Sequence, residues 1–226
     1  MFTGFTDETV RFFLDLRFHN YAEYFHQEHD RYERDVQQPF YDLINAVAPG
    51  LSRIDPEMEL RPHRAISRIH RDTRFSRDKS PYRDHHWVLF RKAGEPREGS
   101  VFYWFEFGPD RLSWGLGVWG ENRPLMDAFR RRLAAKPEET MKLIENCDLP
   151  GHHLALDGRQ FKRIDIPPGL PLGLIPWYRS REIAVIRDNI QYSWAFREDL
   201  PKRLLRDYQT MSPIYWLLRG AYDDRA

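Results

Sequence analysis

Cysteine is almost absent from this chain, since Cys147 is the single one among 226 residues. One cysteine excludes an internal disulfide framework and a zinc site built from several thiolates. Long apolar runs are absent as well, because none approaches the roughly 20 residues that a membrane-spanning helix needs. The sequence therefore predicts a protein without a membrane span and without a cysteine-based metal centre.

An excess of charge of either sign is also missing. Lysine and arginine total 35 and aspartate and glutamate total 34, which gives a formal net charge of +1. A protein that coats nucleic acid non-specifically needs a broadly basic surface, which this balance argues against. The first residues carry neither a basic segment nor a cleavage site, so we expect no signal peptide and a cytoplasmic protein.

Several chemical signatures do not occur. The chain has no nucleophile elbow, no phosphate-binding loop with its Gly-Lys-Ser/Thr ending, and no dinucleotide-binding glycine pattern. His26 and His29 are spaced to share a helix face, but they lack the order of a zinc hydrolase. His85 and His86 would point to opposite faces of a strand. We therefore predict no cofactor and no metal.

Aromatic residues, in contrast, are abundant. They make up 15% of the chain, and all hydrophobic residues together make up 41%. This composition is typical of a soluble globular protein rather than of a disordered chain. A chain of this length can bury one large core, so we expect residues 1–226 to form a single domain.

Helices are expected at both ends of the chain. Thr6 has the character of an N-cap, and a second helix near Asn20 is predicted to be interrupted by Pro39 and to stop at Pro49-Gly50. Later helices are expected in four segments, at 122–135, 138–147, 200–211 and from Ser212 onward.

Strands are expected in the middle of the chain, at 65–71, 87–90, 101–107, 112–119 and 182–187. Gly108-Pro109-Asp110 predicts a hairpin between the third and fourth of these segments. In the fourth, Ser113, Gly115 and Gly117 would leave one face nearly bare, open to a helix, a long side chain or a ligand. The overall prediction is an α+β fold, with a mostly antiparallel sheet flanked by N-terminal and C-terminal helices.

The stretch from Arg64 to Arg83 has the densest positive charge in the sequence. It carries a formal charge of +5, so the rest of the chain sums to −4. Positive charge packed this closely repels itself unless carboxylates or a bound anion compensate it. The basic residues are Arg64, Arg68, Arg71, Arg74, Arg77, Lys79 and Arg83, and the two acids are Asp72 and Asp78.

Part of this stretch forms a recognisable motif. Arg68, Arg71, Asp72, Arg74, Phe75, Lys79 and Tyr82 stand as R-x-x-R-D-x-R-F-x-x-x-K-x-x-Y. The motif resembles the signature of DUF2461, a bacterial and fungal family of domains of unknown function. The opening Phe2-Thr3-Gly4-Phe5 and the glycine-bearing strand before Asn122 are similar to the family too. The resemblance implies no reaction and no catalytic residues.

The side chains of this motif suit an oxyanion. Arg68, Arg71, Arg74 and Lys79 offer forked and single donors for phosphate or carboxylate. Asp72 could orient one guanidinium, and the Tyr82 hydroxyl could donate to the same anion. Asp72 and His70 are the candidates for proton transfer. We therefore expect a small anionic ligand in a pocket walled by Gly115 and Gly117, and whether the protein is also an enzyme is left open.

Two other interpretations remain open. In the first, the motif is a structural ion-pair network in which Arg68, at a partly buried position, and Arg74 pair with acids such as Glu23, Glu106 or Asp72. In the second, the protein binds RNA or DNA, with the basic stretch on phosphates and exposed aromatics stacking on bases. Arg77 and Arg83 are expected to be solvated surface charges under every interpretation. The oligomeric state is left open.

Overall fold

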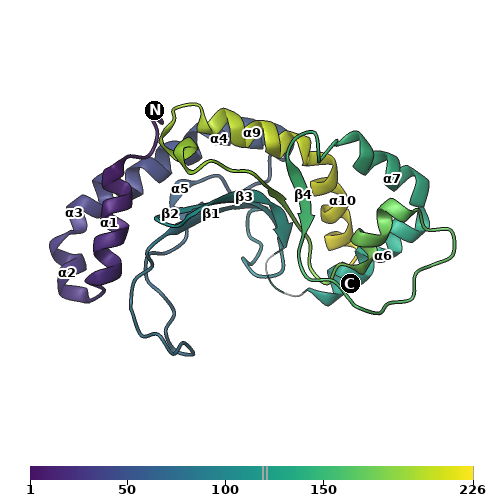
Figure 1. Cartoon of the computed structure of the whole chain (residues 1–226), viewed down its shortest axis with the longest axis horizontal. Helices are drawn as coiled ribbons and strands as arrows, with labels where there is room; N and C mark the ends of the chain where they lie inside the picture. The colour runs from purple at the N-terminus through teal and green to yellow at the C-terminus, as the bar shows by residue number, and fades with distance from the viewer. Residues whose placement is uncertain (119, 121, 226) are drawn as a thin grey trace. The chain divides into compact units, whose positions relative to one another are not determined.

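A computed structural model describes residues 1–118, 120 and 122–225 (Figure 1). Its five strands form one antiparallel sheet in the order β1-β2-β3-β5-β4. Helices lie at both ends of the chain, so the predicted α+β class is confirmed. No helix within the described residues is both long enough and apolar enough to cross a membrane.

The chain divides into two compact units. Unit 1 contains residues 1–90, 104–113 and 190–205, and unit 2 contains residues 91–103, 114–189 and 206–226. The single domain expected from length stays a prediction.

Unit 1 begins with helix α1 (Asp7–Phe18), which starts where Thr6 predicted it. The backbone N–H of Thr6 donates to Thr9 Oγ1 at 3.3 Å, and acidic residues occupy the first turn. Phe5 packs beside Phe40 and Phe107, with ring centroids 4.8 and 4.5 Å away. Aromatic rings therefore pack against one another in the core of this unit, together with aliphatic side chains.

The second helical region differs from the sequence prediction at both of its prolines. It runs as α2 (Ala22–Gln27), α3 (His29–Tyr32), the π-helix η1 (Glu33–Gln37) and α4 (Gln38–Ile54). Pro39 does not interrupt it, because this residue lies in the first turn of α4, where a missing N–H costs little. Pro49-Gly50 does not stop it either, because the helix continues for another turn. Gly50 packs there against the side chain of Leu205.

The hairpin was predicted correctly. Strand β1 (His86–Arg91) is followed by β2 (Val101–Gly108) and β3 (Arg111–Val118), with a turn at Pro109-Asp110. Trp119, predicted to end this last strand, lies outside the described residues. The predicted strand at 65–71 is wrong: Ala65 ends the short helix α5 (Pro62–Ala65), and the extended backbone beyond it makes only isolated bridges.

Unit 2 contains helices α6 (Arg123–Ala135), α7 (Pro137–Asn146) and α10 (Ser212–Asp223), which contact one another. Asn122 caps α6 as predicted, since its Oδ1 accepts from the Leu125 N–H at 3.1 Å. The Pro- and Gly-rich segment at 166–176 contains a 3-10 turn, η2 (Leu172–Leu174), and leads into the short helix α8 (Ile175–Arg179). Helix α9 (Leu200–Thr210) contributes residues to both units.

Two strands complete the sheet in unit 2. The predicted strand at 182–187 is present as β5 (Ala184–Arg187), and β4 (Leu154–Asp157), which the sequence analysis missed, pairs with it. Gly117 opposes Ala184 in register. A Cβ added to Gly117 would collide with the carbonyl oxygen of Ile183, so backbone, rather than a ligand, fills the space beside this glycine.

A buried ion pair lies in the core of unit 2. Arg187 Nη1 lies 2.8 Å from the Oδ2 atom of Asp207, whose side chain is fully buried. The Trp114 indole N–H donates to the same oxygen at 2.8 Å. Arg187 also donates to the His152 carbonyl oxygen at 3.0 Å, so polar groups from several segments satisfy one another inside the unit.

Candidate functional site

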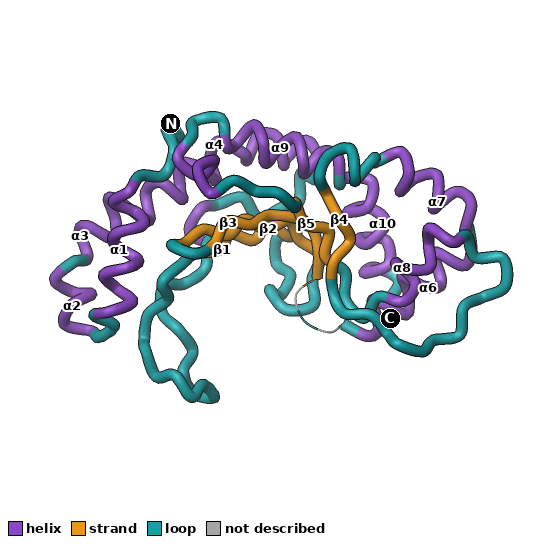
Figure 2. The backbone as a smooth tube through the Cα atoms, in the orientation of Figure 1, coloured by secondary structure: helices purple, strands orange, loops and turns teal. Residues whose placement is uncertain are grey.

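The predicted motif forms an arm of unit 1, defined here as residues 69–83. Two short stretches form its base and run antiparallel, because the Arg71 N–H donates to the Pro81 carbonyl at 2.8 Å and the Arg83 N–H donates to that of Ile69 at 2.9 Å. Figure 2 shows the arm as a loop that extends away from the strands. A base held by backbone hydrogen bonds gives its side chains fixed positions.

Asn20 attaches the arm to the start of the helical region. Its side-chain amide donates to the Tyr82 carbonyl at 3.0 Å and accepts from the Tyr82 N–H at 2.9 Å. The Tyr82 ring stacks on Phe25, with centroids 4.3 Å apart and planes at 21°. Burial raises the pKa of the Tyr82 hydroxyl. Asn20 and Tyr82 therefore have a positioning role at the base of the arm.

A cavity of about 330 Å³ lies at the base of the arm and is called the arm cavity below. It is more positive than negative, because four arginines and two aspartates line it. These residues are Arg17, Arg71, Arg83, Arg111, Asp78 and Asp84, and the remaining lining comes from Asn20, Ser80, Tyr82 and His85.

Most of these arginines have carboxylate partners. Arg17 donates to Asp84 and to Asp110, both at 2.7 Å, and Arg71 pairs with Asp78. Hydrogen bonds from Arg71 and Ser80 hold the pKa of Asp78 well below its usual range. These pairs support part of the structural interpretation that the sequence left open.

Arg83 is the exception. Its guanidinium lies over the Trp87 ring, 4.4 Å from the centroid, and its buried Nε has no hydrogen-bond partner among the residues that the structure describes. No carboxylate of the described chain forms an ion pair with it. Burial, together with the nearby charge of Arg71, lowers the pKa of Arg83. The expectation that Arg83 is a solvated surface charge is therefore wrong, because packing on Trp87 partly buries it.

The other motif residues lie outside the lining of this cavity. Arg74 is exposed and pairs with Asp72 at 2.7 Å, and this pairing lowers the pKa of Asp72 to about 2. Lys79 is exposed and donates to the Thr73 carbonyl at 2.9 Å. Arg68 and His70 are exposed as well. Arg68 was expected to be partly buried, but Ser67 faces inward in its place and bonds His86.

Of the ligand-binding candidates predicted from the sequence, the arm cavity thus brings together Arg71 and Tyr82. Gly115 and Gly117 belong to unit 2 and do not line it. The sequence analysis missed Arg17, Arg83 and Arg111 as cavity residues. Arg17 and Arg111 come from distant segments, and no local pattern marks them.

His85 is a further residue that the sequence analysis did not assign to the site. Its Nδ1 lies 2.8 Å from Asp84 Oδ1, and its Nε2 lies 3.5 Å from Glu106 Oε1. The hydrogen bond with His85 is the largest cause that holds the pKa of Asp84 well below its usual range. An imidazole held by two carboxylates at the lining of a cavity can give or take a proton close to a bound ligand.

The neighbouring His86 has a structural position. It is completely buried, 3.0 Å from the Tyr32 hydroxyl and 2.8 Å from the Ser67 hydroxyl. Burial lowers the pKa of His86 to about 3, so the imidazole is neutral in the folded protein near neutral pH.

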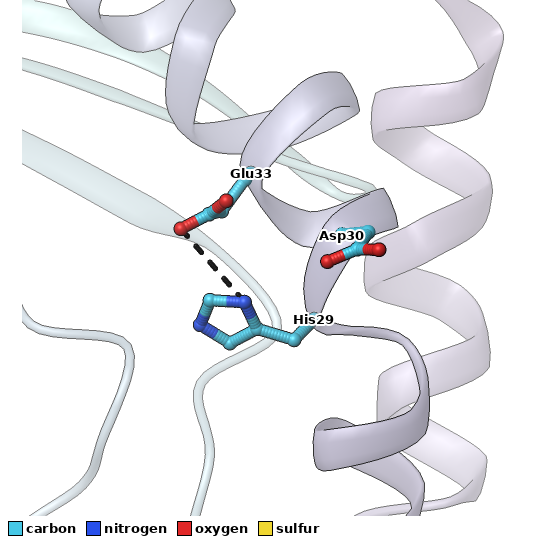
Figure 3. Close-up of side chains that lie close together, drawn as sticks. All are labelled: His29, Asp30 and Glu33. Atoms are coloured by element: carbon cyan, nitrogen blue, oxygen red, sulfur yellow. Dashed lines mark ion pairs between the residues drawn. The ribbon is translucent and has the colours of Figure 1, made fainter.

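One group of possible metal ligands occurs among the described residues. His29, Asp30 and Glu33 each offer a ligand atom, and these atoms lie within 4.8 Å of one another. Figure 3 shows the His29 ring facing the Glu33 carboxylate, from which its Nδ1 is 3.8 Å away. All three side chains are exposed and lie on consecutive turns of one helical region, and we assign no metal to them.

Exposed aromatic side chains bear on the nucleic-acid interpretation. On the β2–β3 hairpin, Trp114 is buried and Trp104 is half-buried. Phe75, in contrast, is 95% exposed at the tip of the arm. Arg74, Arg77 and Lys79 are exposed around it.

Comparison with known proteins places the chain in a family. Residues 8–216 match the family model described as "Conserved hypothetical protein (DUF2461)". The chain belongs to the DUF2461 family. The match covers most of the chain, so the resemblance carried by the arm motif is confirmed at the level of the family. Neither a curated protein nor a solved structure matches the chain.

Proposed function

We propose that this DUF2461 protein binds a small anionic ligand, bearing a phosphate or carboxylate group, in the arm cavity. The observation that carries the proposal is Arg83, a partly buried guanidinium that lines the cavity and pairs with no described carboxylate. A buried cation without a counter-ion costs free energy, and an anion entering the cavity would offset that cost.

The neighbourhood of Arg83 supports an anion rather than a neutral ligand. Arg71 lies close enough to lower the pKa of Arg83, so two positive groups already repel each other at this cavity. A phosphate or carboxylate between them would accept several charge-assisted hydrogen bonds from planar donors. Cation–π contact with Trp87 fixes the direction of one of those donors.

The size of the cavity sets an upper limit on the ligand. A volume of about 330 Å³ is at the small end of the range for small-molecule sites. The ligand is therefore a small metabolite or the terminal group of a larger molecule. A reaction at this cavity would have His85 as its proton carrier, since Asp72 and His70 do not line it.

Thermal unfolding in inorganic phosphate tests this proposal with two matched variants. Arg83→Gln removes the unpaired charge of the cavity, and Arg77→Gln removes an exposed charge from the tip of the same arm. Bound phosphate stabilises the folded state by about 2.7 kcal/mol when its concentration is about 100 times Kd. Phosphate also stabilises proteins by exclusion from their surface, so variants are compared at equal concentration.

We expect the native chain and Arg77→Gln to gain the same increase in Tm, and Arg83→Gln to gain a clearly smaller one. Isothermal titration calorimetry should show the same difference in phosphate affinity between these proteins. An equal phosphate response in all three proteins would contradict the proposal.

Binding of single-stranded nucleic acid is the second candidate, favoured by Phe75. An aromatic ring that is 95% exposed beside basic side chains has the character of a base-stacking platform. This function predicts that Phe75→Ala weakens binding of an oligonucleotide, while Arg83→Gln has little effect. The anion-binding function predicts that Phe75→Ala leaves phosphate binding unchanged. Phosphate and oligonucleotide titrations of these two variants therefore separate the candidates.

A further inference from the structure

A second cavity, called the α6 cavity below, lies within unit 2 and has a volume of about 380 Å³. One of its walls comes from α6, where Arg123, Met126, Asp127 and Arg130 follow the i, i+3, i+4, i+7 spacing of a single helix face. The facing residues come from the extended chain around Phe161 and from Arg181.

Backbone hydrogen bonds fix the facing wall. The Phe161 N–H donates to the Arg179 carbonyl at 2.8 Å, and the Arg181 N–H donates to the Arg159 carbonyl at 2.8 Å. The two stretches are therefore paired in antiparallel fashion on either side of the Gln160–Ser180 bridge. The ring of Phe161 is held in a defined place although it is 36% exposed.

Positive charge dominates this cavity. Among its described lining residues are four arginines and one carboxylate, Asp127, which lies 2.8 Å from Arg130 and 3.7 Å from Arg123. Arg163 is exposed and pairs with no carboxylate among the described residues. One acid shared between two arginines leaves donor capacity for an external anion.

The Arg130 side chain has a fixed position in the lining of the α6 cavity. It is 8% exposed, and it donates from Nε to the Tyr178 carbonyl at 2.9 Å and from Nη2 to the Ser180 carbonyl at 2.6 Å. Its guanidinium carbon lies 5.2 Å from the Phe161 ring centroid, and that of Arg181 lies 5.3 Å from it. The aromatic ring and the two cations are thus held together before any ligand arrives.

Apolar side chains complete the lining, because Phe161, Met126 and Ile164 contribute carbon surface next to the arginines. We propose that the α6 cavity binds a second small anion, whose negative group is joined to a flat apolar body such as an aryl ring. The anionic group would lie toward the arginines, and the ring would pack on Phe161. This site is independent of the arm cavity, and its ligand differs in needing an apolar part.

Calorimetric titration of the full chain with phenyl phosphate tests the site, with benzoate, inorganic phosphate and phenol as comparison probes. The Arg83→Gln variant is used throughout, so that phosphate binding at the arm cavity does not contribute. We expect phenyl phosphate to bind more tightly than inorganic phosphate, and phenol to bind least. Benzoate shows whether a carboxylate replaces the phosphate group.

Three further substitutions assign the binding. Arg163→Gln should weaken phenyl phosphate binding by about threefold to fivefold, the upper part of the range expected for one exposed charge. Phe161→Leu should weaken it by about threefold to tenfold and leave inorganic phosphate unchanged, because the lost contact is to the ring. Arg179→Gln, which removes an exposed charge outside the lining, should have no effect.

Absence of phenyl phosphate binding in the folded Arg83→Gln protein would overturn the proposal. Equal losses in Arg163→Gln and Arg179→Gln would also overturn it, since the binding would then follow net charge alone. Circular dichroism of each variant shows whether it is folded before the titration is interpreted.

Discussion

The guanidinium of Arg83 rests on the face of Trp87, with 4.4 Å between the Arg83 Cζ atom and the centroid of the indole ring. An aromatic face holds a cation in place but leaves its charge uncompensated. A carboxylate holds the cation in place and also neutralises its charge. This contact distinguishes Arg83 from Arg17 and Arg71, which meet acids at the same cavity. It leaves a positioned positive charge available to a ligand.

Replacing Arg83 with methionine should separate binding from stability. Methionine keeps an apolar stem on Trp87 and removes the uncompensated charge, so the free energy of unfolding should stay within about 1 kcal/mol of the native value or rise. Phosphate binding should be lost. Urea denaturation and calorimetry measure the two effects. A destabilisation above about 2 kcal/mol would assign Arg83 a structural role instead.

Removing the acid that pairs with Arg71 should strengthen anion binding. Asp78→Asn keeps an acceptor for the Ser80 N–H but frees the guanidinium of Arg71, so phosphate should bind about threefold to tenfold more tightly. Arg71→Gln should weaken binding by a similar factor. Asp72→Asn is the matched control, because its partner Arg74 lies outside the cavity lining. An equal gain in affinity for both acid variants would show that only net charge matters.

The buried imidazole of His86 should make stability depend on pH. Its pKa is about 3 in the folded protein and about 6.5 in an unfolded chain, so the unfolded state binds the extra proton between these values. The stabilisation is complete above pH 6.5 and is lost as the pH falls toward 3, by up to about 1.4 kcal/mol per pH unit.

The His86→Gln variant should lose this part of the pH dependence, whereas His26→Gln, at an exposed position, should retain it. Urea unfolding at several pH values measures the difference between the two variants and the native chain. If the free energy of unfolding depended on pH in the same way in His86→Gln and in the native chain, His86 would not be the cause of the pH dependence.

Removing only the acid of the buried Arg187–Asp207 ion pair in unit 2 should lower the free energy of unfolding. Asp207→Asn leaves Arg187 buried at 6% side-chain exposure with its carboxylate partner removed, which typically costs about 3–5 kcal/mol. Asp188→Asn, next to Arg187 and exposed, should change the free energy of unfolding by less than about 1 kcal/mol. Chemical denaturation measures the free energy of unfolding of both variants. Similar values for both variants would mean that water reaches Arg187.

Local signals predicted much of the secondary structure. Thr6 and Asn122 mark helix starts, and Gly108-Pro109-Asp110 marks the hairpin, because capping and turn chemistry act over a few residues. Pro49-Gly50 failed as a stop signal, since the packing of Gly50 against Leu205 is a tertiary contact. Strand β4 was missed because four residues gain their strand character only by pairing with β5.

The sequence indicated the segment that carries the candidate site, but it did not predict most of the residues that line the cavity. The charge density of the arm pointed to a segment that contributes to the arm cavity, and Arg71 and Tyr82 line that cavity. Arg83 was interpreted as a surface charge because nothing in the sequence shows that its side chain packs on Trp87. Arg17 joins the cavity from a helix far away in the chain, and that juxtaposition exists only in three dimensions.

The arm has one more consequence, which concerns proteolysis. Arg74 and Arg77 stand exposed at its tip, whereas Arg71 and Arg83 are partly covered. Within the arm, a protease that cleaves after basic residues would therefore cut at the tip before it cuts after Arg71 or Arg83. The backbone hydrogen bonds of Arg71 to Pro81 and of Arg83 to Ile69 lie below that cut. A nicked molecule would keep its two fragments together and preserve the lining of the cavity.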